Sequence, residues 1–367
     1  MADPTIAVII VTYNSRGEID ACLRSLYADL GDRAAEIVVV DNASPDGTAE
    51  HVAQTWPDVR VLAQRINRGF AAANNRGLEA TTGDPALLLN PDTVVQPGAV
   101  DALIAVLKMA PTVTLSGSTG QGALRRDASE ESRPYDGDAL LESHRNAAHG
   151  TNPLSMTFSP AVPVAPPPAD HTSPNVGIVG PMLLNADGSL QPSQRDFPTL
   201  LGDLMGMAEL YRLAFVRRLF GRRMTSLSDH RTAGYVPWLS GACLLVRRAA
   251  AMAAGPLDEG FFMYSEEMEW QYRMAQHGWR AWFEPAARVT HLGGASTAQV
   301  GGQRIVWQYQ SIFRFYRLYR NRGQRLALRL LVWAITWPKV IFLILAGGGQ
   351  SHRQGLRRAF WRVLWLN

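Results

Sequence analysis

Short runs of apolar residues, each followed by a polar turn, recur through the first ninety residues of the chain. The runs cover residues 6–11, 37–40, 59–62 and 87–89, and segments with apolar residues at helical spacing lie between them. A continuous apolar run of this length is typical of a strand buried on both faces. Strands that alternate with helices predict an α/β fold built on a doubly wound, mainly parallel sheet.

Polar side chains follow these predicted strands, at the place where open α/β sheets bind ligands. Pro91 ends the fourth strand because it has no N–H to donate, and Asp92 comes next. A carboxylate in this place suits Mn²⁺ or Mg²⁺, although a cap on the next turn explains it equally well. Asp41, Asn42 and Asn67 follow the other strands, and their polar groups suit a nucleobase edge, a ribose or a turn.

Two common nucleotide-binding signatures do not occur in the sequence. No Gly-x-Gly-x-x-Gly follows the first strand, and there is no Walker motif. The sequence therefore argues against a dinucleotide-binding domain and against a P-loop enzyme.

The composition changes between residues 113 and 175. Eight of the 22 prolines lie here among Ser, Gly, Asp and Arg, with few sustained apolar runs. We interpret this segment as a disordered or loosely packed insertion. Residues 1–112 and 176–300 are then the two halves of one α/β domain, and residues 301–367 form a separate tail.

Small residues and acids mark two stretches of the second half. Gly241 and Ala242 interrupt an apolar strand, which leaves room for a ligand or for a closely packed helix. Glu266, Glu267 and Glu269 follow an aromatic run. At helical spacing Glu266 and Glu269 share a face while Glu267 points elsewhere. Surface acids favoured by the helix dipole are the alternative interpretation.

A single histidine, His291, ends a predicted strand ahead of a glycine pair. A lone histidine usually has a structural role, but beside candidate acids at a strand end it can ligate a metal.

Charge is divided unevenly along the chain. Residues 301–367 hold eleven Arg, one Lys and no acid, which leaves residues 1–300 with a net charge of −8. The tail also holds five of the ten tryptophans, and its apolar content favours an anionic membrane surface over nucleic acid. We expect it to bind the membrane peripherally, because Pro338 and Lys339 interrupt its apolar stretch 330–346. A second apolar stripe, at Leu356, Phe360, Val363 and Leu364, supports the same prediction, and packing on the body or in a homo-oligomer is the alternative.

The two cysteines, Cys22 and Cys243, both lie in apolar surroundings. We expect reduced thiols in a protein at the cytoplasmic face of the membrane, since the first residues lack the basic start and apolar core of a signal peptide.

Seven of these stretches together resemble the family 2 inverting glycosyltransferases of the GT-A fold, and in particular a bacterial rhamnosyltransferase-like branch that builds cell-surface glycans. In the family's order they are residues 11–14, 40–44, 67–70, 89–92, 238–242, 261–269 and 291–294. The resemblance implies a mixed, mainly parallel sheet flanked by helices. Residues 1–112 would bind the nucleotide-sugar and residues 176–300 the acceptor.

The resemblance also implies roles at matching positions. The nucleotide-sugar would be bound by Thr12, Tyr13, Asn14, Asp41, Asn42, Asn67, Gly69, Asn90 and Asp92. Asp92 would hold Mn²⁺ or Mg²⁺ with the help of His291, and Glu267 would be the general base. The acceptor would be bound by Glu266, Glu269, Trp238, Gly241 and Ala242.

Three positions depart from the family pattern, in two ways. Asn90 replaces the first acid of the common Asp-x-Asp, so the metal has one charged ligand fewer. Glu267 and Glu269 replace aspartates and are one methylene longer, and a carboxylate displaced by about 1 Å loses ~10²-fold in rate unless the backbone compensates.

We therefore expect an enzyme that moves a sugar, rhamnose from dTDP-rhamnose or another dTDP- or UDP-sugar, to a lipid-linked or polysaccharide acceptor. An inactive glycan-binding or assembly subunit is the alternative that the replaced acids suggest. A sugar-nucleotide pyrophosphorylase is a further alternative, but that class needs a Gly-rich basic loop after the first strand, and residues 12–15 supply none.

Overall fold

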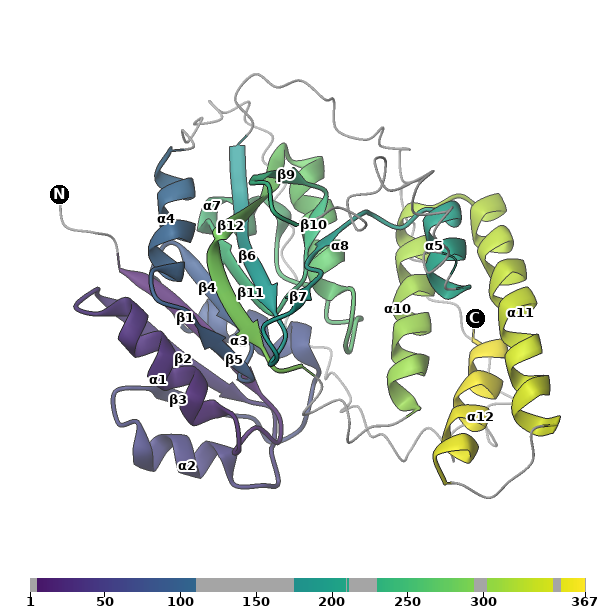
Figure 1. The fold of residues 1–367 in the computed structure, drawn as a ribbon, viewed down its shortest axis with the longest axis horizontal. Helices are drawn as coiled ribbons and strands as arrows, with labels where there is room; N and C mark the ends of the chain where they lie inside the picture. The colour runs from purple at the N-terminus through teal and green to yellow at the C-terminus, as the bar shows by residue number, and fades with distance from the viewer. Residues whose placement is uncertain are drawn as a thin grey trace, which may run out of the picture.

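The computed structural model describes residues 5–109, 175–208, 210, 230–293, 302–345 and 351–366. The insertion predicted between residues 113 and 175 lies almost entirely outside them. Figure 1 shows a twisted sheet with helices on both sides and, beside it, a bundle of helices from the end of the chain.

A ten-stranded sheet forms the centre of the molecule, in the order β3-β2-β1-β4-β11-β6-β12-β5, with β7 beside β6 and β9 beside β12. The strands from the first half of the chain are β1 (Ile6–Thr12), β2 (Ala35–Asp41), β3 (Arg60–Ala63), β4 (Ala86–Leu89) and β5 (Thr93–Val95). Those from the second half are β6 (Asn175–Leu184), β7 (Leu190–Gln191), β9 (Gly234–Val236), β11 (Cys243–Val246) and β12 (Trp279–His291). A separate pair joins β8 (Gln194–Arg195) to β10 (Trp238–Leu239).

The pairing makes this a mixed sheet in which one direction dominates. The strands β3, β2, β1, β4, β6 and β12 run one way, and β11, β5, β7 and β9 run the other way. The prediction of a mainly parallel sheet is therefore confirmed. Both halves of the predicted domain contribute strands to it.

The apolar runs are buried on both faces, as their composition predicts, and all seven residues of β1 are buried. Ile6, Val8 and Ile10 pack in one cluster with α1 (Ile19–Leu30) and α4 (Ala99–Met109). Ala7 and Ile9 pack in the opposite cluster with α3 (Phe70–Glu79), α7 (Arg248–Ala254) and α8 (Glu266–Gln276). The short α2 (Thr48–Thr55) follows β2. Alternate side chains of each strand therefore hold the two helical layers to the sheet.

The basic tail forms the bundle beside the sheet, with α10 (Gln303–Tyr319), α11 (Arg322–Leu345), α12 (Ser351–Leu364) and the earlier α5 (Leu200–Met207). Phe315, Leu328, Val332 and Val363 share its buried core with Phe261 and Met268 of the sheet domain. Helix α11 is long and apolar enough to cross a membrane, by length and composition, and Pro338 lies inside it without ending it.

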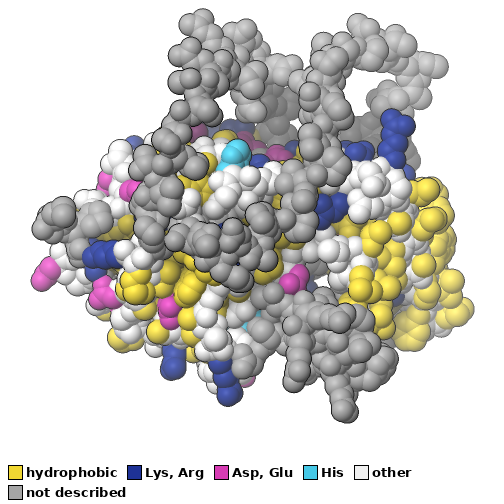
Figure 2. Space-filling model, turned by 90° about the horizontal axis from the view of Figure 1, so that it is seen from above, with side chains coloured by type: hydrophobic (Ala, Val, Ile, Leu, Met, Phe, Trp, Pro, Cys, Tyr) yellow, Lys and Arg dark blue, Asp and Glu magenta, His cyan; other side chains and the backbone are white. Residues whose placement is uncertain are grey.

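The apolar stripe predicted on α12 turns partly inward. Val363 and Leu364 are buried in the bundle, and Leu356 and Phe360 are half-buried. The exposed apolar side chains instead come mainly from α11, with Leu330, Ile341, Phe342 and Leu345, together with Trp361 of α12 and Trp365 just after it. Figure 2 shows hydrophobic side chains gathered over the right-hand edge of the molecule, on the side where the bundle lies.

The packing of α3 on β1 generates a test of this fold. A methyl group added at Gly77 would lie 2.3 Å from Cγ2 of the buried Ile9, so Gly77→Ala overpacks the interface between helix and sheet. We expect a loss of about 1–3 kcal/mol in the free energy of unfolding, measured by urea denaturation. Gly206→Ala is the matched control, because a methyl group there would meet nothing within 4 Å and alanine favours the helix. Equal stability of the two variants would contradict this packing.

Candidate active site

A cavity of about 770 Å³ lies at the carboxyl ends of β1, β2 and β4. Its walls come from segments far apart in the sequence. Of the predicted site residues, Tyr13, Asn42, Asn67, Gly69, Asn90, Asp92, Gly241, Ala242, Glu266, Glu267 and His291 line it. Thr12, Asn14, Asp41, Trp238 and Glu269 do not appear among its lining residues.

Thr12 and Asp41 lie in the layer beneath the cavity. The Asp41 carboxylate accepts hydrogen bonds from the Thr12 hydroxyl at 2.7 Å, from the Ser44 N–H at 2.8 Å and from the Ser44 hydroxyl at 2.5 Å. Ser44 Oγ in turn accepts from the backbone N–H of Asn14 at 2.9 Å. These residues fix the turns after β1 and β2, so the geometry shows a supporting position beneath the lining.

Asn42 and Asn67 line the cavity and also shape the loop before α3. Asn42 Nδ2 donates to the Gly69 carbonyl at 3.0 Å, and Asn67 Oδ1 accepts from the Gly69 N–H at 2.9 Å. Gly69 has φ +88°, and a methyl group on it would lie 2.3 Å from the carbonyl oxygen of Phe262. Only glycine fits this contact, which brings the loop before α8 against the loop before α3.

Strand register brings Asn90, Asp92 and His291 together. In the antiparallel pair of β12 and β5, His291 lies opposite Thr93, and the Leu292 N–H donates to the Asp92 carbonyl at 2.9 Å. His291 Nε2 then lies 3.4 Å from Asp92 Oδ1 and 3.3 Å from Asn90 Nδ2.

Gln191, from the hairpin strand β7, sets the orientation of the imidazole ring. Its Oε1 lies 2.7 Å from His291 Nδ1. Since an amide oxygen only accepts, Nδ1 carries the proton and the lone pair of Nε2 points toward Asp92. Asn90 turns its Nδ2 toward the same ring nitrogen, and its Oδ1 is buried with no partner among the described residues. The carboxylate and the imidazole can therefore hold a cation, and the amide oxygen joins them when the Asn90 amide turns over.

Gly241 and Ala242, the small residues that precede β11, lie directly beside these groups. Cys243 pairs with Leu89 across β11 and β4, and the Asn90 N–H donates to the Ala242 carbonyl at 2.9 Å. A methyl group on Gly241 would lie 3.3 Å from Glu267 Cγ, so the glycine leaves room for the Glu267 side chain. Gly241 and Ala242 thus join the strand-end groups to the acids of α8.

Helix α8 begins directly at the acids, after Tyr264 and Ser265, which have φ +71° and +69°. Glu266 is 4% exposed, lines the cavity and has one oxygen without a partner among the described residues. Burial, and then the charge of Glu267, raise the pKa of Glu266 well above its usual range. Burial also raises the pKa of Glu267, opposed by backbone N–H groups at the helix start, the N–H of Gly241 and the charge of Arg195.

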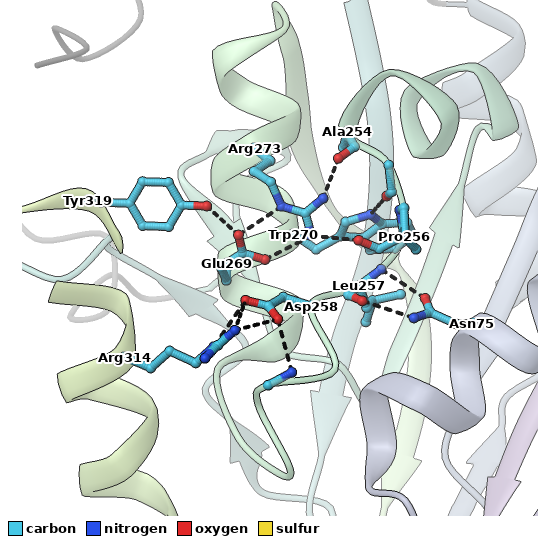
Figure 3. A network of polar contacts seen from close by, with 12 residues as sticks. Asn75, Ala254, Pro256, Leu257, Asp258, Glu269, Trp270, Arg273, Arg314 and Tyr319 are labelled. Atoms are coloured by element: carbon cyan, nitrogen blue, oxygen red, sulfur yellow. Dashed lines mark hydrogen bonds and ion pairs between the residues drawn. The ribbon is translucent and has the colours of Figure 1, made fainter. Parts of the chain in front are cut away.

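Glu269 turns away from the cavity into the contacts drawn in Figure 3. It is 1% exposed, and its oxygens accept from Arg273 Nε at 2.8 Å and Arg273 Nη2 at 2.9 Å. The hydroxyl of Tyr319 in α10 donates to the same carboxylate. The ion pair expected from the spacing of Glu269 and Arg273 is present, whereas an acceptor-binding position for Glu269 finds no support in this geometry.

Trp238 also lies away from the cavity lining. Its indole N–H donates to the Asp196 carbonyl at 2.8 Å, and its ring packs against the core of the bundle. The indole is therefore held by the protein, and the geometry does not support an acceptor contact.

Several residues that line the cavity were not predicted from the sequence. Gln191 lies in a two-residue strand that shows no periodicity, so nothing local marks it. Arg304, Trp307 and Gln308 line the cavity from α10. Their i, i+3, i+4 spacing places them on one face of a helix, and this signal could have identified them. They were missed because the whole tail was predicted to contact the membrane.

Comparisons with known proteins agree with the predicted resemblance. Residues 7–156 match the model of glycosyl transferase family 2. The N-acetylglucosaminyl-diphospho-decaprenol L-rhamnosyltransferase of Mycobacterium tuberculosis is 25% identical over 321 residues, which cover 84% of this chain and 83% of that protein. The succinoglycan biosynthesis protein ExoO of Rhizobium meliloti is 34% identical over 102 residues, or 28% of this chain and 29% of that protein.

Among solved structures, the mannosyltransferase PcManGT from Pyrobaculum calidifontis, in complex with GDP-Man and Mn²⁺, superposes with a TM-score of 0.47 and 16% identity. The superposition covers 99% of this chain and 90% of that one. The family match over residues 7–156 and the long alignment with a rhamnosyltransferase confirm the resemblance found in the sequence: this chain is similar to the family 2 glycosyltransferases.

Proposed function

We propose that this glycosyltransferase moves a rhamnosyl group from a nucleoside diphosphate sugar, dTDP-rhamnose, to a lipid-linked acceptor with inversion at the anomeric carbon. The observation that carries the proposal is a cavity in which strand-end groups suited to a nucleotide-sugar face two buried acids. The similarity to a rhamnosyltransferase whose name specifies a diphospho-decaprenol substrate supports the choice of sugar and acceptor.

Glu267 is the general base in this proposal. The base must take the proton of the acceptor hydroxyl as its oxygen attacks the anomeric carbon, and the leaving nucleoside diphosphate departs on the opposite side. Burial raises the pKa of Glu267 toward the pH at which the enzyme works, which strengthens it as a base. Burial and the neighbouring charge of Glu267 raise the pKa of Glu266, which favours its protonated form, and in that form it would donate a hydrogen bond to a sugar hydroxyl.

Asn90, Asp92 and His291 are the residues that would hold a divalent cation. Such an ion neutralises charge on the leaving diphosphate when it is bound. No group of three or more His, Cys, Asp or Glu side chains suited to a metal occurs within the described ranges. The low ligand charge predicts weak binding of the free ion and tighter binding once the diphosphate adds its oxygens.

The bundle places this chemistry at a membrane surface in our proposal. Phe342 and Leu345 of α11, Trp361 of α12 and Trp365 just after it offer exposed apolar surface, and both helices also carry exposed arginines. A bilayer with anionic lipids satisfies both kinds of group, and the cytoplasmic leaflet carries such lipids.

The base assignment is tested by Glu267→Gln, which keeps the shape of the side chain and removes its basicity. We expect kcat to fall by ~10²-fold or more with nearly unchanged donor binding. The acidic limb of kcat/KM in the wild type should lie above pH 4.5, because the base works only when deprotonated and its pKa is raised. Glu267→Asp should also lose activity, since a shorter carboxylate withdraws from the position beside Gly241. Near-normal turnover in Glu267→Gln, with loss in Glu266→Gln or Glu269→Gln, would move the role to that neighbour.

The metal assignment is tested with EDTA and with Asp92→Ala, each of which should abolish turnover. His291→Ala should raise the Mn²⁺ concentration for half-maximal rate without lowering Tm, and calorimetry should show weaker Mn²⁺ binding in the presence of the nucleoside diphosphate. Asp32→Ala is the control, because Asp32 is exposed in the loop before β2, at the opposite end of that strand. Undiminished activity in EDTA would remove the metal from the reaction.

Membrane binding is tested by flotation with anionic liposomes followed by a carbonate wash. We expect the full chain to float and the wash to release it. The double change Phe342→Glu and Leu345→Glu should abolish flotation, because these side chains are 68% and 79% exposed on α11. Met252→Glu is the control, since Met252 is equally exposed but lies on α7. Complete resistance to the wash would show instead that α11 spans the bilayer.

A further inference from the structure

Helix α10 forms a wall of the cavity as well as a wall of the bundle. Arg304, Trp307 and Gln308, at i, i+3 and i+4, face the cavity. Trp307 packs against Phe262 of the loop before α8, with 4.9 Å between ring centroids. The opposite side of the helix lies toward α11 and α12 (Figure 1).

The charges in the cavity make Arg304 unusual. Asp92, Glu266 and Glu267 line the same space, and Arg304 is the one Lys or Arg among the lining residues that the structure describes. A diphosphate entering beside those acids needs compensating positive charge.

Within the described residues Arg304 is unengaged, as is Arg317 of the same helix, whereas Arg314 of that helix and Arg320, which follows it, are held by the protein. Arg314 pairs with Asp258 at 2.7 Å, and Arg320 donates to the Pro198 carbonyl at 2.9 Å over the ring of Phe315. No hydrogen bond or ion pair joins the exposed Arg304 to any residue in the described part of the chain. Among the described residues, nothing competes with a ligand for its guanidinium.

We propose that Arg304 binds a phosphate group of a substrate in this cavity. The guanidinium fork matches two phosphate oxygens, and such charge-assisted hydrogen bonds are among the strongest available. The inference rests on the proposed function, which offers two sources of the same chemistry: the diphosphate of the donor and the diphosphate of a lipid-linked acceptor.

The experiment compares the full-length wild type with Arg304→Gln, Arg304→Lys and Arg317→Gln. Arg317 is the matched control, because it is exposed on the same helix and does not line the cavity. A first arm titrates inorganic pyrophosphate by calorimetry, which reads the site without any turnover. A second arm measures the Kd of dTDP and of UDP. A third measures KM for two acceptors with the same sugar and alkyl chain, of which only one has a diphosphate bridge.

Arg304→Gln should weaken pyrophosphate binding by about 10–100-fold, Arg304→Lys should restore part of it, and Arg317→Gln should match the wild type. If Arg304→Gln weakens binding of the nucleotides alone, Arg304 contacts the donor diphosphate. If it raises KM for the diphosphate-bridged acceptor alone, Arg304 contacts the acceptor diphosphate. Binding constants of Arg304→Gln equal to those of Arg317→Gln in every arm would overturn the proposal. A wild type that binds pyrophosphate through Arg304 but transfers no sugar would refute the proposed function and leave this site standing.

Discussion

The ion pair between Glu269 and Arg273 is the interaction on which the geometry of the site depends. Arg273 donates to both oxygens of Glu269 and also to the carbonyls of Ala254 and Pro256, while Tyr319 reaches the same carboxylate from α10 (Figure 3). Breaking one partner of a buried pair leaves an uncompensated charge and typically costs about 3–5 kcal/mol. The pair therefore fixes α8 against α7 and α10 more than it adds net stability.

The loop from Gly255 to Ser265 is held at several further points. Asn75 exchanges two hydrogen bonds with Leu257, at 2.8 and 2.9 Å, and Arg314 forms its ion pair with Asp258. Gly260 carries no side chain, and a methyl group there would lie 2.1 Å from the Arg314 guanidinium carbon. The loop that delivers Glu266 and Glu267 is thus tied to the sheet domain and to the bundle together. A site assembled in this way keeps buried acids in place without filling the space that a substrate needs.

The sequence predicted the strand ends well because the chemistry there is local. Continuous apolar runs define buried strands, and the polar residue after each run must lie at the same edge of a parallel sheet. Asp92 was identified in this way, and Glu267 as one of three acids after an aromatic run, with the resemblance adding their roles. Glu269 and Gln191 could not be placed so easily. The direction of Glu269 depends on Tyr319, fifty residues later, and the place of Gln191 depends on the register of a short hairpin.

In the tail, too, the local sequence did not determine which partner each helix contacts. An amphipathic pattern specifies that one face of a helix is covered, but protein and lipid satisfy it equally. The stripe on α12 meets protein, while α11 leaves its apolar residues exposed. Nothing in the local sequence distinguishes Trp307 of α10, which lines the cavity, from the exposed tryptophans later in the tail.

The contact between Gly69 and Phe262 has a mechanical consequence. The Phe70 N–H donates to the Phe262 carbonyl at 3.0 Å. This backbone hydrogen bond joins the start of α3 directly to the loop that precedes the acids of α8. Phe262 stands four residues before Glu266, with two left-handed residues between them and little slack in the chain. A displacement of either loop is therefore transmitted to the other, so the two walls of the cavity that these loops form are mechanically coupled.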